Sequence, residues 1–243
     1  MKKLIYLFFF MISLFVLNTC EKDENKETVC RVTITIIKSG DEIDSILYTY
    51  DSQGRILKSD LGEGWYTTYQ YETNKITEKN YATDLLSSTN VYTLDFDGYA
   101  MTSTHTLAGS SDPESTTTYD FDENGYLIST TEVKRDDHTD ITTINYEYED
   151  GNQVYREHIR EKSSFYSETE YEYYLDKTNK FNDRSPFKGK QNINLTKKAT
   201  YTSGTINLVT NFSYELNKAG YVIKEIQTVS TVVYEIEYIY DCN

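Results

Sequence analysis

The stretch whose residue types and spacing best fit a chemical site is Asp120-Phe-Asp-Glu-Asn-Gly125. Oxygen-bearing side chains at its first, third and fifth positions, with glycine sixth, match the first half of a helix-flanked calcium loop. The twelfth position, which should hold a bidentate Glu, is Thr131. The same offsets suit a tight β-hairpin turn, in which Asp and Asn bond the local backbone. We therefore interpret this stretch as a turn and keep a calcium site at Asp120, Asp122 and Asn124 as the alternative.

The other residues that could do chemistry form no catalytic pattern. The histidines, His105, His138 and His158, are scattered, and neither a paired metal-ligand spacing nor a Gly-x-Ser-x-Gly nucleophile elbow occurs. Carboxylates are abundant, but nothing marks one pair as the acid and base of a glycoside hydrolase. The sequence thus predicts a protein that is not an enzyme and holds no cofactor or metal. A hydrolase acting through a carboxylate pair is the alternative from the enzyme class.

The aromatic content is the feature with functional meaning, since the chain has 24 tyrosines and one tryptophan. Tyr and Trp stack on sugar faces and anchor protein interfaces. Most of these tyrosines recur in a repeat, where we expect them to form the core. Trp65 and Tyr66 follow a Gly-Glu-Gly turn, and Phe187 lies in an irregular segment. These three are the candidate binding residues.

The repeat is clearest at residues 119–128, where alternating aromatics lead into Asp-Glu-Asn-Gly and a second apolar alternation follows. Its turn positions, from Gly54 to Gly151, are spaced about 20 to 27 residues apart, so each unit is one β-hairpin that buries its aromatic face against its neighbours. The other copies lie at 48–57, 69–76, 94–99, 146–154, 171–179 and 212–222, with a half unit at 238–241.

This pattern predicts an all-β domain: one antiparallel, up-and-down sheet of about sixteen strands. An even strand count places the last strand beside the first, so the sheet is either rolled or closed. Residues 177–192 break the alternation and predict one long loop that has room for a single helical turn. A membrane-spanning barrel is disfavoured because one face of each strand is polar, as at Glu168, Glu170 and Glu172, whereas the outward face must be apolar.

Residues 1–19 have the form of a signal peptide, with a basic start and a short apolar run. The following Cys20 resembles the acylated cysteine of a bacterial lipobox. Residues 20–28 form an acidic tether, whose Lys22, Asp23 and Glu24 resemble the signal that sends Bacteroidota lipoproteins to the outer face of the outer membrane. We expect a lipid anchor and a surface position, with the periplasmic face as the alternative. The β-repeat domain then spans 29–243.

With Cys20 lipidated, Cys30 and Cys242 remain for a disulfide in an oxidising compartment, or as two free thiols. The formal net charge is −15, and removing residues 1–19 takes away two lysines and no acid, giving −17. So acidic a chain does not hold a polyanion electrostatically, which argues against nucleic acid as a partner.

The Tyr-x-Tyr-Asp-x-x-Gly-Arg-Ile form at 48–57 resembles the tyrosine–aspartate repeats of Rhs-type proteins. The whole arrangement is similar to a family of uncharacterised Bacteroidota lipoproteins that carry a lipobox, tandem hairpins and a late loop like that at Pro186-Phe187. That family is a domain of unknown function, so the resemblance implies no catalytic residue. One departure is that Arg55 has no counterpart in later units, where Tyr99, Tyr126 and Tyr221 stand.

Taken together, the sequence predicts an outer-membrane-anchored, surface-exposed lipoprotein with a non-catalytic binding or scaffold role toward a glycan or an envelope protein. Besides the hydrolase, the second alternative to this role is a lipid or lipoprotein carrier, which requires an apolar groove inside a curled sheet.

Overall fold

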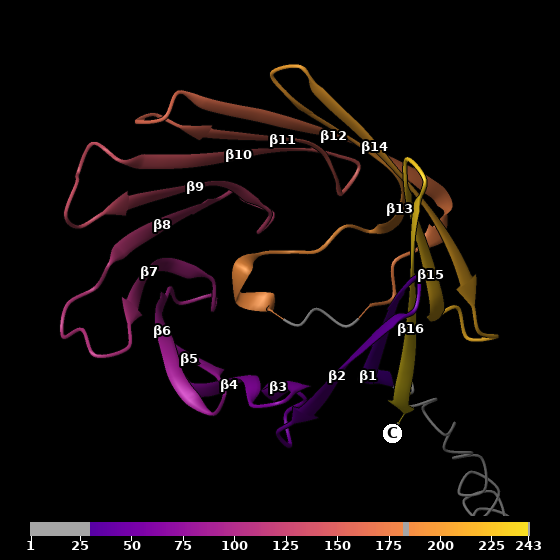
Figure 1. Ribbon diagram of the computed structural model, residues 1–243, viewed down its shortest axis with the longest axis horizontal. Coiled ribbons are helices and arrows are strands. Elements are labelled where there is room, and N and C mark those ends of the chain that lie inside the picture. The colour runs from indigo at the N-terminus through magenta and orange to yellow at the C-terminus, as the bar shows by residue number, and fades with distance from the viewer. Residues whose placement is uncertain (1–29, 182–184, 243) are drawn as a thin grey trace, which may run out of the picture. The chain divides into compact units, whose positions relative to one another are not determined.

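A computed structural model describes residues 30–181 and 185–242. Within this part, all strands belong to one antiparallel sheet in which each strand pairs with its sequence neighbours and β16 returns to β1. The sheet is therefore a closed up-and-down barrel (Figure 1). The predicted all-β class, the strand count of sixteen and the up-and-down order are confirmed, and of the two forms left open the closed one is adopted.

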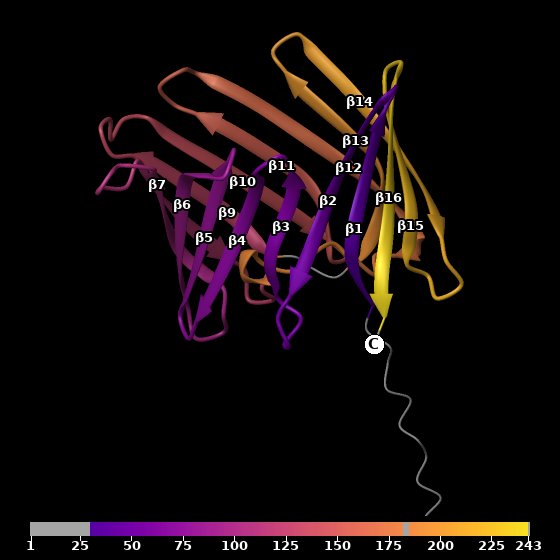
Figure 2. The same ribbon diagram turned by 60° about the horizontal axis from the view of Figure 1, so that its bottom comes forward.

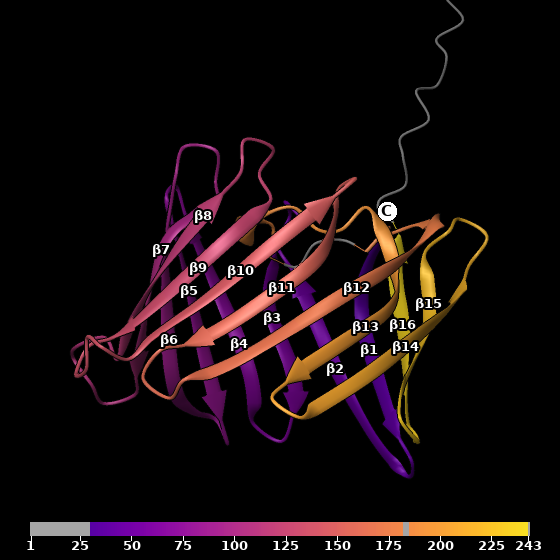
Figure 3. The same cartoon turned by 90° about the horizontal axis from the view of Figure 1, so that it is seen from above.

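The strands can be followed around the barrel in Figures 1, 2 and 3. They are β1 Cys30–Ser39, β2 Glu42–Tyr50, β3 Ile56–Gly62, β4 Trp65–Glu72, β5 Lys75–Ala82, β6 Leu85–Leu94, β7 Ala100–Leu107, β8 Ser115–Phe121, β9 Leu127–Lys134, β10 Ile141–Glu149, β11 Asn152–Arg160, β12 Phe165–Thr178, β13 Asn194–Ser203, β14 Ile206–Leu216, β15 Val222–Val229 and β16 Val232–Cys242, with one 3₁₀ turn, η1 Pro186–Lys188.

The turns that follow β2, β6, β8 and β14 share one hydrogen-bonding pattern. They lie at the same end of the barrel, because every second connection of an up-and-down sheet is at the same end. In the turn after β8, Asp122 Oδ1 accepts hydrogen bonds from the backbone N–H groups of Asn124 and Tyr126, at 2.9 and 2.8 Å. Gly125 follows with φ of +84°, a left-handed conformation that suits glycine. The turns starting at Asp51, Asp95 and Asn217 repeat this bonding, and we call this end the bulged end.

Each of these turns is followed by a β-bulge, which shifts the register and leaves ladder groups to be satisfied elsewhere. The shift falls at Ile56 after the first such turn. The Ile56 carbonyl accepts a hydrogen bond from the hydroxyl of Tyr71 on β4, at 2.9 Å. The same tyrosine-to-carbonyl bond recurs from Tyr50 to Val32, Tyr173 to Gln153 and Tyr240 to Val222, at 2.6, 2.6 and 2.8 Å. These tyrosines therefore do more than fill the core, because each ties its strand to a neighbour, and three of them do so beside a register shift, at Ile56, Gln153 and Val222.

The connection between β12 and β13 lies inside the ring of strands (Figure 1). We call its described residues, 179–181 and 185–193, the plug. Phe187 of η1 is only 4% exposed and packs with Ile76, Tyr92 and Ala100. Its ring centroid lies 4.8 Å from that of Tyr92, edge to face. The predicted long loop with a helical turn is confirmed, and it contributes to the core.

The outward face of the barrel is polar over strands β7 to β10. Tyr119 faces inward, since it packs against the core and its hydroxyl lies 3.0 Å from Ser103 Oγ. Because strand side chains alternate between faces, Thr118 points outward. Thr118 pairs with Thr102 and Thr131, and Thr131 pairs with Thr143, so one outward row across four strands is all threonine. In the described part of the chain, no helix is long and apolar enough to cross a membrane.

We expect the Tyr71→Phe substitution to lower the free energy of unfolding by about 1–2 kcal/mol, because the Ile56 carbonyl loses its donor while the ring still packs. Tyr81→Phe is the matched control. Its ring stacks on Tyr66, and its hydroxyl makes no hydrogen bond to another described residue. Urea unfolding of the two variants measures the difference, and equal losses would refute the role of the tyrosine hydroxyl.

Acid should destabilise the fold. Hydrogen bonding to Lys162 lowers the pKa of Asp137, and hydrogen bonding to Arg160 lowers that of Asp140. In the unfolded chain, an aspartate side chain has a pKa of about 3.9. Because the folded pKa values lie below this, the unfolded chain binds more protons as pH falls. The stability these groups contribute is present above about pH 4 and is lost as pH falls toward the folded values.

The measurement is the urea midpoint at neutral and at acid pH. The Asp140→Asn variant should show a weaker dependence on pH than the parent protein. Asp41→Asn, in the exposed β1–β2 turn, is the control and should leave the dependence as it is. A parent midpoint that does not change with pH contradicts the expectation.

Candidate functional site

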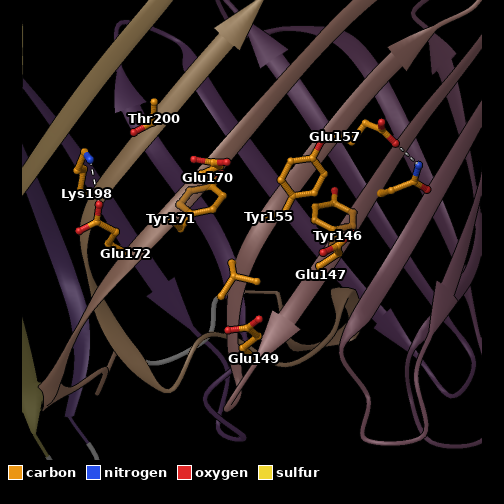
Figure 4. Close-up of a pocket in the computed structure, with 12 residues that line it drawn as sticks. Tyr146, Glu147, Glu149, Tyr155, Glu157, Glu170, Tyr171, Glu172, Lys198 and Thr200 are labelled. Carbon is orange, nitrogen blue, oxygen red and sulfur yellow. Dashed lines mark hydrogen bonds and ion pairs between the residues drawn. The ribbon is translucent and has the colours of Figure 1, made fainter.

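A charged concavity lies on the outside of strands β10 to β13 (Figure 4). It is an open depression of about 940 Å³, lined also by Tyr155, Lys198 and Thr200. Five carboxylates line it and define what we call the acidic face: Glu147, Glu149, Glu157, Glu170 and Glu172.

Strand register brings these side chains together. Glu147 on β10 pairs with Tyr155 on β11, Tyr155 with Glu170 on β12, and Glu170 with Thr200 on β13. Directly paired residues share one face of a sheet, so the four form one outward row. The alternate residues on the same strands, such as Tyr146 and Tyr171, belong to the inward set, and the acidic face is the outer side of a tyrosine-filled wall.

Like charges lie directly opposite one another in the next row, where Glu157 pairs with Glu168. Such a pair is destabilising, and polar neighbours offset the repulsion. Asn145 Nδ2 donates to Glu157 Oε2 at 2.8 Å. The hydroxyls of Tyr155 and Tyr166 both donate to Glu168 Oε2, at 3.1 and 3.0 Å. Hydrogen bonding to Tyr166, together with desolvation and the bond to Glu168, raises the pKa of Tyr155, so its phenol stays protonated.

Lys198 lines the same depression, and its ammonium group forms an ion pair with one of the carboxylates. Its Nζ lies 2.9 Å from Glu172 Oε1, and Lys197 Nζ lies 3.8 Å from Glu172 Oε2. The Lys198 bond lowers the pKa of Glu172. With one carboxylate partly neutralised and the other four unpaired with lysine or arginine in the described chain, the surface stays anionic. It can attract a cationic ligand electrostatically.

The acidic face is not a metal centre by geometry, since no cluster of His, Cys, Asp and Glu in the described ranges could hold a metal ion. In the weaker calcium alternative, Asp122 Oδ1 is occupied by the turn N–H groups and Asp120 Oδ2 accepts from Ser129 Oγ at 2.8 Å. Asn124 Nδ2 lies 3.4 Å from Asp122 Oδ2. Asp122 and Asn124 thus make turn contacts, whereas Asp120 lies in β8 and bonds across to Ser129 of β9.

Two of the sequence-predicted binding residues are accessible. Trp65 begins β4 and is 52% exposed. Tyr66 points outward and stacks on Tyr81 with centroids 4.4 Å apart, while Lys58 Nζ lies 4.2 Å from the Tyr66 ring. The sequence did not reveal Tyr81 and Lys58 as partners, because that requires the register of β3, β4 and β5.

Phe187, the third predicted binding residue, is a core side chain, and its burial between the plug and the barrel wall withholds it from a ligand. The buried carboxylates of the described chain do not face one another as a hydrolase pair would. Asp140 precedes β10 and binds Arg160. Glu225 lies on β15 and accepts from Tyr238 and Gln227.

The sequence also missed the acidic face, although a signal was present. Glutamates alternate with tyrosines at 147–149 and 168–172. The alternation shows that each stripe lies on one face of its strand, but only strand order and register place the stripes side by side.

The cysteines divide between described and undescribed parts of the chain. Cys20, the residues 1–19 and the tether 20–28 lie outside the described residues. Cys30 and Cys242 are both disulfide-bonded cysteines. They begin β1 and end β16, which are neighbours in the sheet order.

Comparison with protein-family models and with curated proteins finds no match. Among solved structures, the chain is similar to a porin-like protein from Bacteroides uniformis, with a TM-score of 0.64 and 16% identity over 86% of this chain and 96% of that one. It is also similar to a porin-like protein from Bacteroides vulgatus, with a TM-score of 0.62 and 15% identity over 87% of this chain and 98% of that one. At these identities the likeness shows the fold.

Proposed function

We propose that this chain is a lipid-anchored, non-catalytic binding protein of the outer membrane, exposed at the cell surface. Its barrel stands in water, and Cys20 carries the anchor. The acidic face of β10 to β13 binds a basic segment of an envelope protein.

The polar outward face of strands β7 to β12 is the observation that carries this proposal. A barrel that spans a bilayer needs an outward apolar band about 25 Å tall. Here threonine forms an outward row across β7 to β10, and glutamate dominates β10 to β12. Charged side chains on a lipid-facing surface are destabilising at the bilayer midplane, by about 2–4 kcal/mol for Arg or Lys and by less for Asp or Glu. The free energy of such a barrel is therefore lower outside the bilayer. Its attachment to the membrane is then made by the lipid on Cys20.

The interior supports a scaffold or binding role rather than a conduit. Phe187 fills the space between Ile76, Tyr92 and Ala100, so the plug is packed into the barrel wall. The two similar structures are described as porin-like. We take from them the barrel and an outer-membrane setting, and we do not extend a pore function to this chain.

A basic protein segment fits the acidic face better than a neutral ligand does. Four of its five carboxylates lack a lysine or arginine partner within the described residues, and the chain carries a net charge of −15. Concentrated charge of one sign attracts the opposite sign over about a Debye length, roughly 8 Å in physiological salt. The half-buried phenol of Tyr155 and the exposed phenol of Tyr166 add the amphipathic contact area typical of interfaces.

Anchoring by lipid is tested by the Cys20→Ser substitution. We expect the variant chain to leave the membrane fraction, because the polar outward face of β7 to β12 would not hold the barrel in the bilayer. The Lys22→Ala, Asp23→Ala, Glu24→Ala triple variant is the matched control. It should stay in the membrane fraction but lose sensitivity to protease added to intact cells. A Cys20→Ser protein that remains with the membrane would mean that the barrel itself is embedded.

Binding by the acidic face is tested with a short oligolysine peptide and the purified full-length protein. The double variant Glu147→Gln, Glu170→Gln should bind roughly tenfold more weakly, because each exposed charge contributes about 0.5–1 kcal/mol. Affinity should also fall as salt is added.

The control removes the same charge elsewhere, with Glu42→Gln and Glu63→Gln at exposed positions of β2 and the β3–β4 turn. Isothermal calorimetry at low and physiological salt compares the proteins. If both double variants weaken binding equally, the peptide is responding to net charge and the acidic face is not its site.

A further inference from the structure

The plug creates a second concavity at the bulged end of the barrel, away from the acidic face. It has a volume of about 330 Å³, within the lower range of small-ligand pockets. Its lining residues are Tyr99, Tyr126, Pro186, Gly189, Lys190, Gln191 and Ile193.

Its two tyrosines occupy equivalent positions in successive turns and are held rigidly. The backbone N–H of Tyr99 donates to Asp95 Oδ1, and that of Tyr126 donates to Asp122 Oδ1, both at 2.8 Å. Their carbonyls accept from the N–H groups of the same two aspartates, at 2.8 and 2.9 Å. Asp95, and Asp122 of the calcium alternative, therefore fix the backbone of the tyrosines that line the pocket.

Each tyrosine ring is packed against one neighbour and lines the pocket as well. Tyr99 stacks on Phe121 with centroids 5.0 Å apart, and Tyr126 lies against Tyr148 at 4.8 Å. Rings that are backed in this way cannot swing away when a ligand arrives. They form a preorganised aromatic wall, which lowers the entropy cost of binding.

The opposite wall, supplied by the plug, is also fixed. The backbone N–H of Lys190 donates to the Gly125 carbonyl at 2.9 Å, and that of Ile193 donates to the Gly151 carbonyl at 3.1 Å. Gly189 has φ of +105°, and a Cβ there would lie 3.1 Å from Leu127 N, so glycine lets the plug approach the wall closely. The pocket is thus built by contacts between distant parts of the chain.

Lys190 gives the pocket a positive charge in an acidic protein. Its Nζ lies 5.7 Å from the centroid of the Tyr126 ring. No carboxylate in the described ranges lies within ion-pair distance of it. The chain as a whole carries a net charge of −15, so the attraction for an anionic group is local and comes from this ammonium group beside the two tyrosines.

We infer that this pocket binds an acidic sugar, a pyranose ring that carries a carboxylate, as in a uronic acid. The apolar C–H face of such a ring stacks on the tyrosines. Its carboxylate pairs with Lys190 in a charge-assisted contact, and Gln191, whose Nε2 is engaged with the Phe181 carbonyl, keeps its side-chain oxygen for a sugar hydroxyl. This site is separate from the acidic face, so it stands or falls independently of the proposed protein partner.

The chemistry distinguishes an acidic sugar from the other ligands that suit aromatic pockets. A proline-rich segment would use the rings but leave the lysine without a partner. An acyl chain would bury the ammonium group against hydrocarbon, which is costly. A carboxylated sugar satisfies the rings and the charge together.

The test is calorimetric titration of the purified full-length protein with trigalacturonate, and with galactotriose as the neutral counterpart. The parent protein should bind the acidic trisaccharide. Lys190→Met keeps the aliphatic stem and should weaken that binding roughly tenfold, by removing one charge-assisted contact. Tyr99→Leu and Tyr126→Leu should weaken it comparably, by removing the stacking faces.

Lys180→Met is the matched control, since Lys180 Nζ also lies 5.7 Å from a turn tyrosine, Tyr221, but is engaged with the Ala219 carbonyl at 2.8 Å. It should bind as the parent does, and thermal melting of every variant checks folding. Three results would overturn the inference: no binding of trigalacturonate, equal binding of galactotriose, or unchanged binding by Lys190→Met.

Discussion

The hydrogen bond from a tyrosine hydroxyl to a carbonyl beside a β-bulge is the interaction on which this barrel depends. Each Asp- or Asn-initiated turn is followed by a bulge, as at Ile56 and Val222, which bends the strand and disrupts the ladder. A buried carbonyl without a donor costs about 1–3 kcal/mol. Tyr71 and Tyr240 supply that donor from the next strand. At these two bulges the bend that curves the sheet toward closure is thus tolerated because the repeat places a tyrosine opposite the irregularity.

The same alternation that aims tyrosines inward aims glutamate and threonine outward. Along β12, Tyr171 belongs to the inward set while Glu170 and Glu172 line the outer depression. A one-residue change of register would exchange these faces, burying carboxylates and exposing phenols, so the tyrosine bonds also protect the polarity of the outer surface. Architecture and surface chemistry are therefore two results of one period-two pattern.

The sequence predicted the fold better than the sites, for a physical reason. Hairpins such as 119–128 are local, and alternation with Asp-Glu-Asn-Gly specifies strand, turn and strand without reference to the rest of the chain. The acidic face joins Glu147 to Glu170, and the pocket joins Tyr126 to Lys190; both depend on register or on long-range hydrogen bonds. Phe187 illustrates the limit. Its segment was recognised as irregular, but only the closed barrel determines that the irregular segment lies inside.

A barrel made of near-identical hairpins offers near-identical surfaces, so a specific site requires something that breaks the repetition. The plug provides this asymmetry. Tyr126 and Tyr221 follow equivalent turns, and each has a lysine 5.7 Å from its ring. Beside Tyr221, the ammonium group of Lys180 donates a hydrogen bond to the Ala219 carbonyl, in the turn that precedes Tyr221. At Tyr126 the backbone N–H of Lys190 makes the anchoring bond to Gly125, which leaves the ammonium group for a ligand. The same residue pair is structural in one unit and suited to binding in the other because of where the plug's main chain is held.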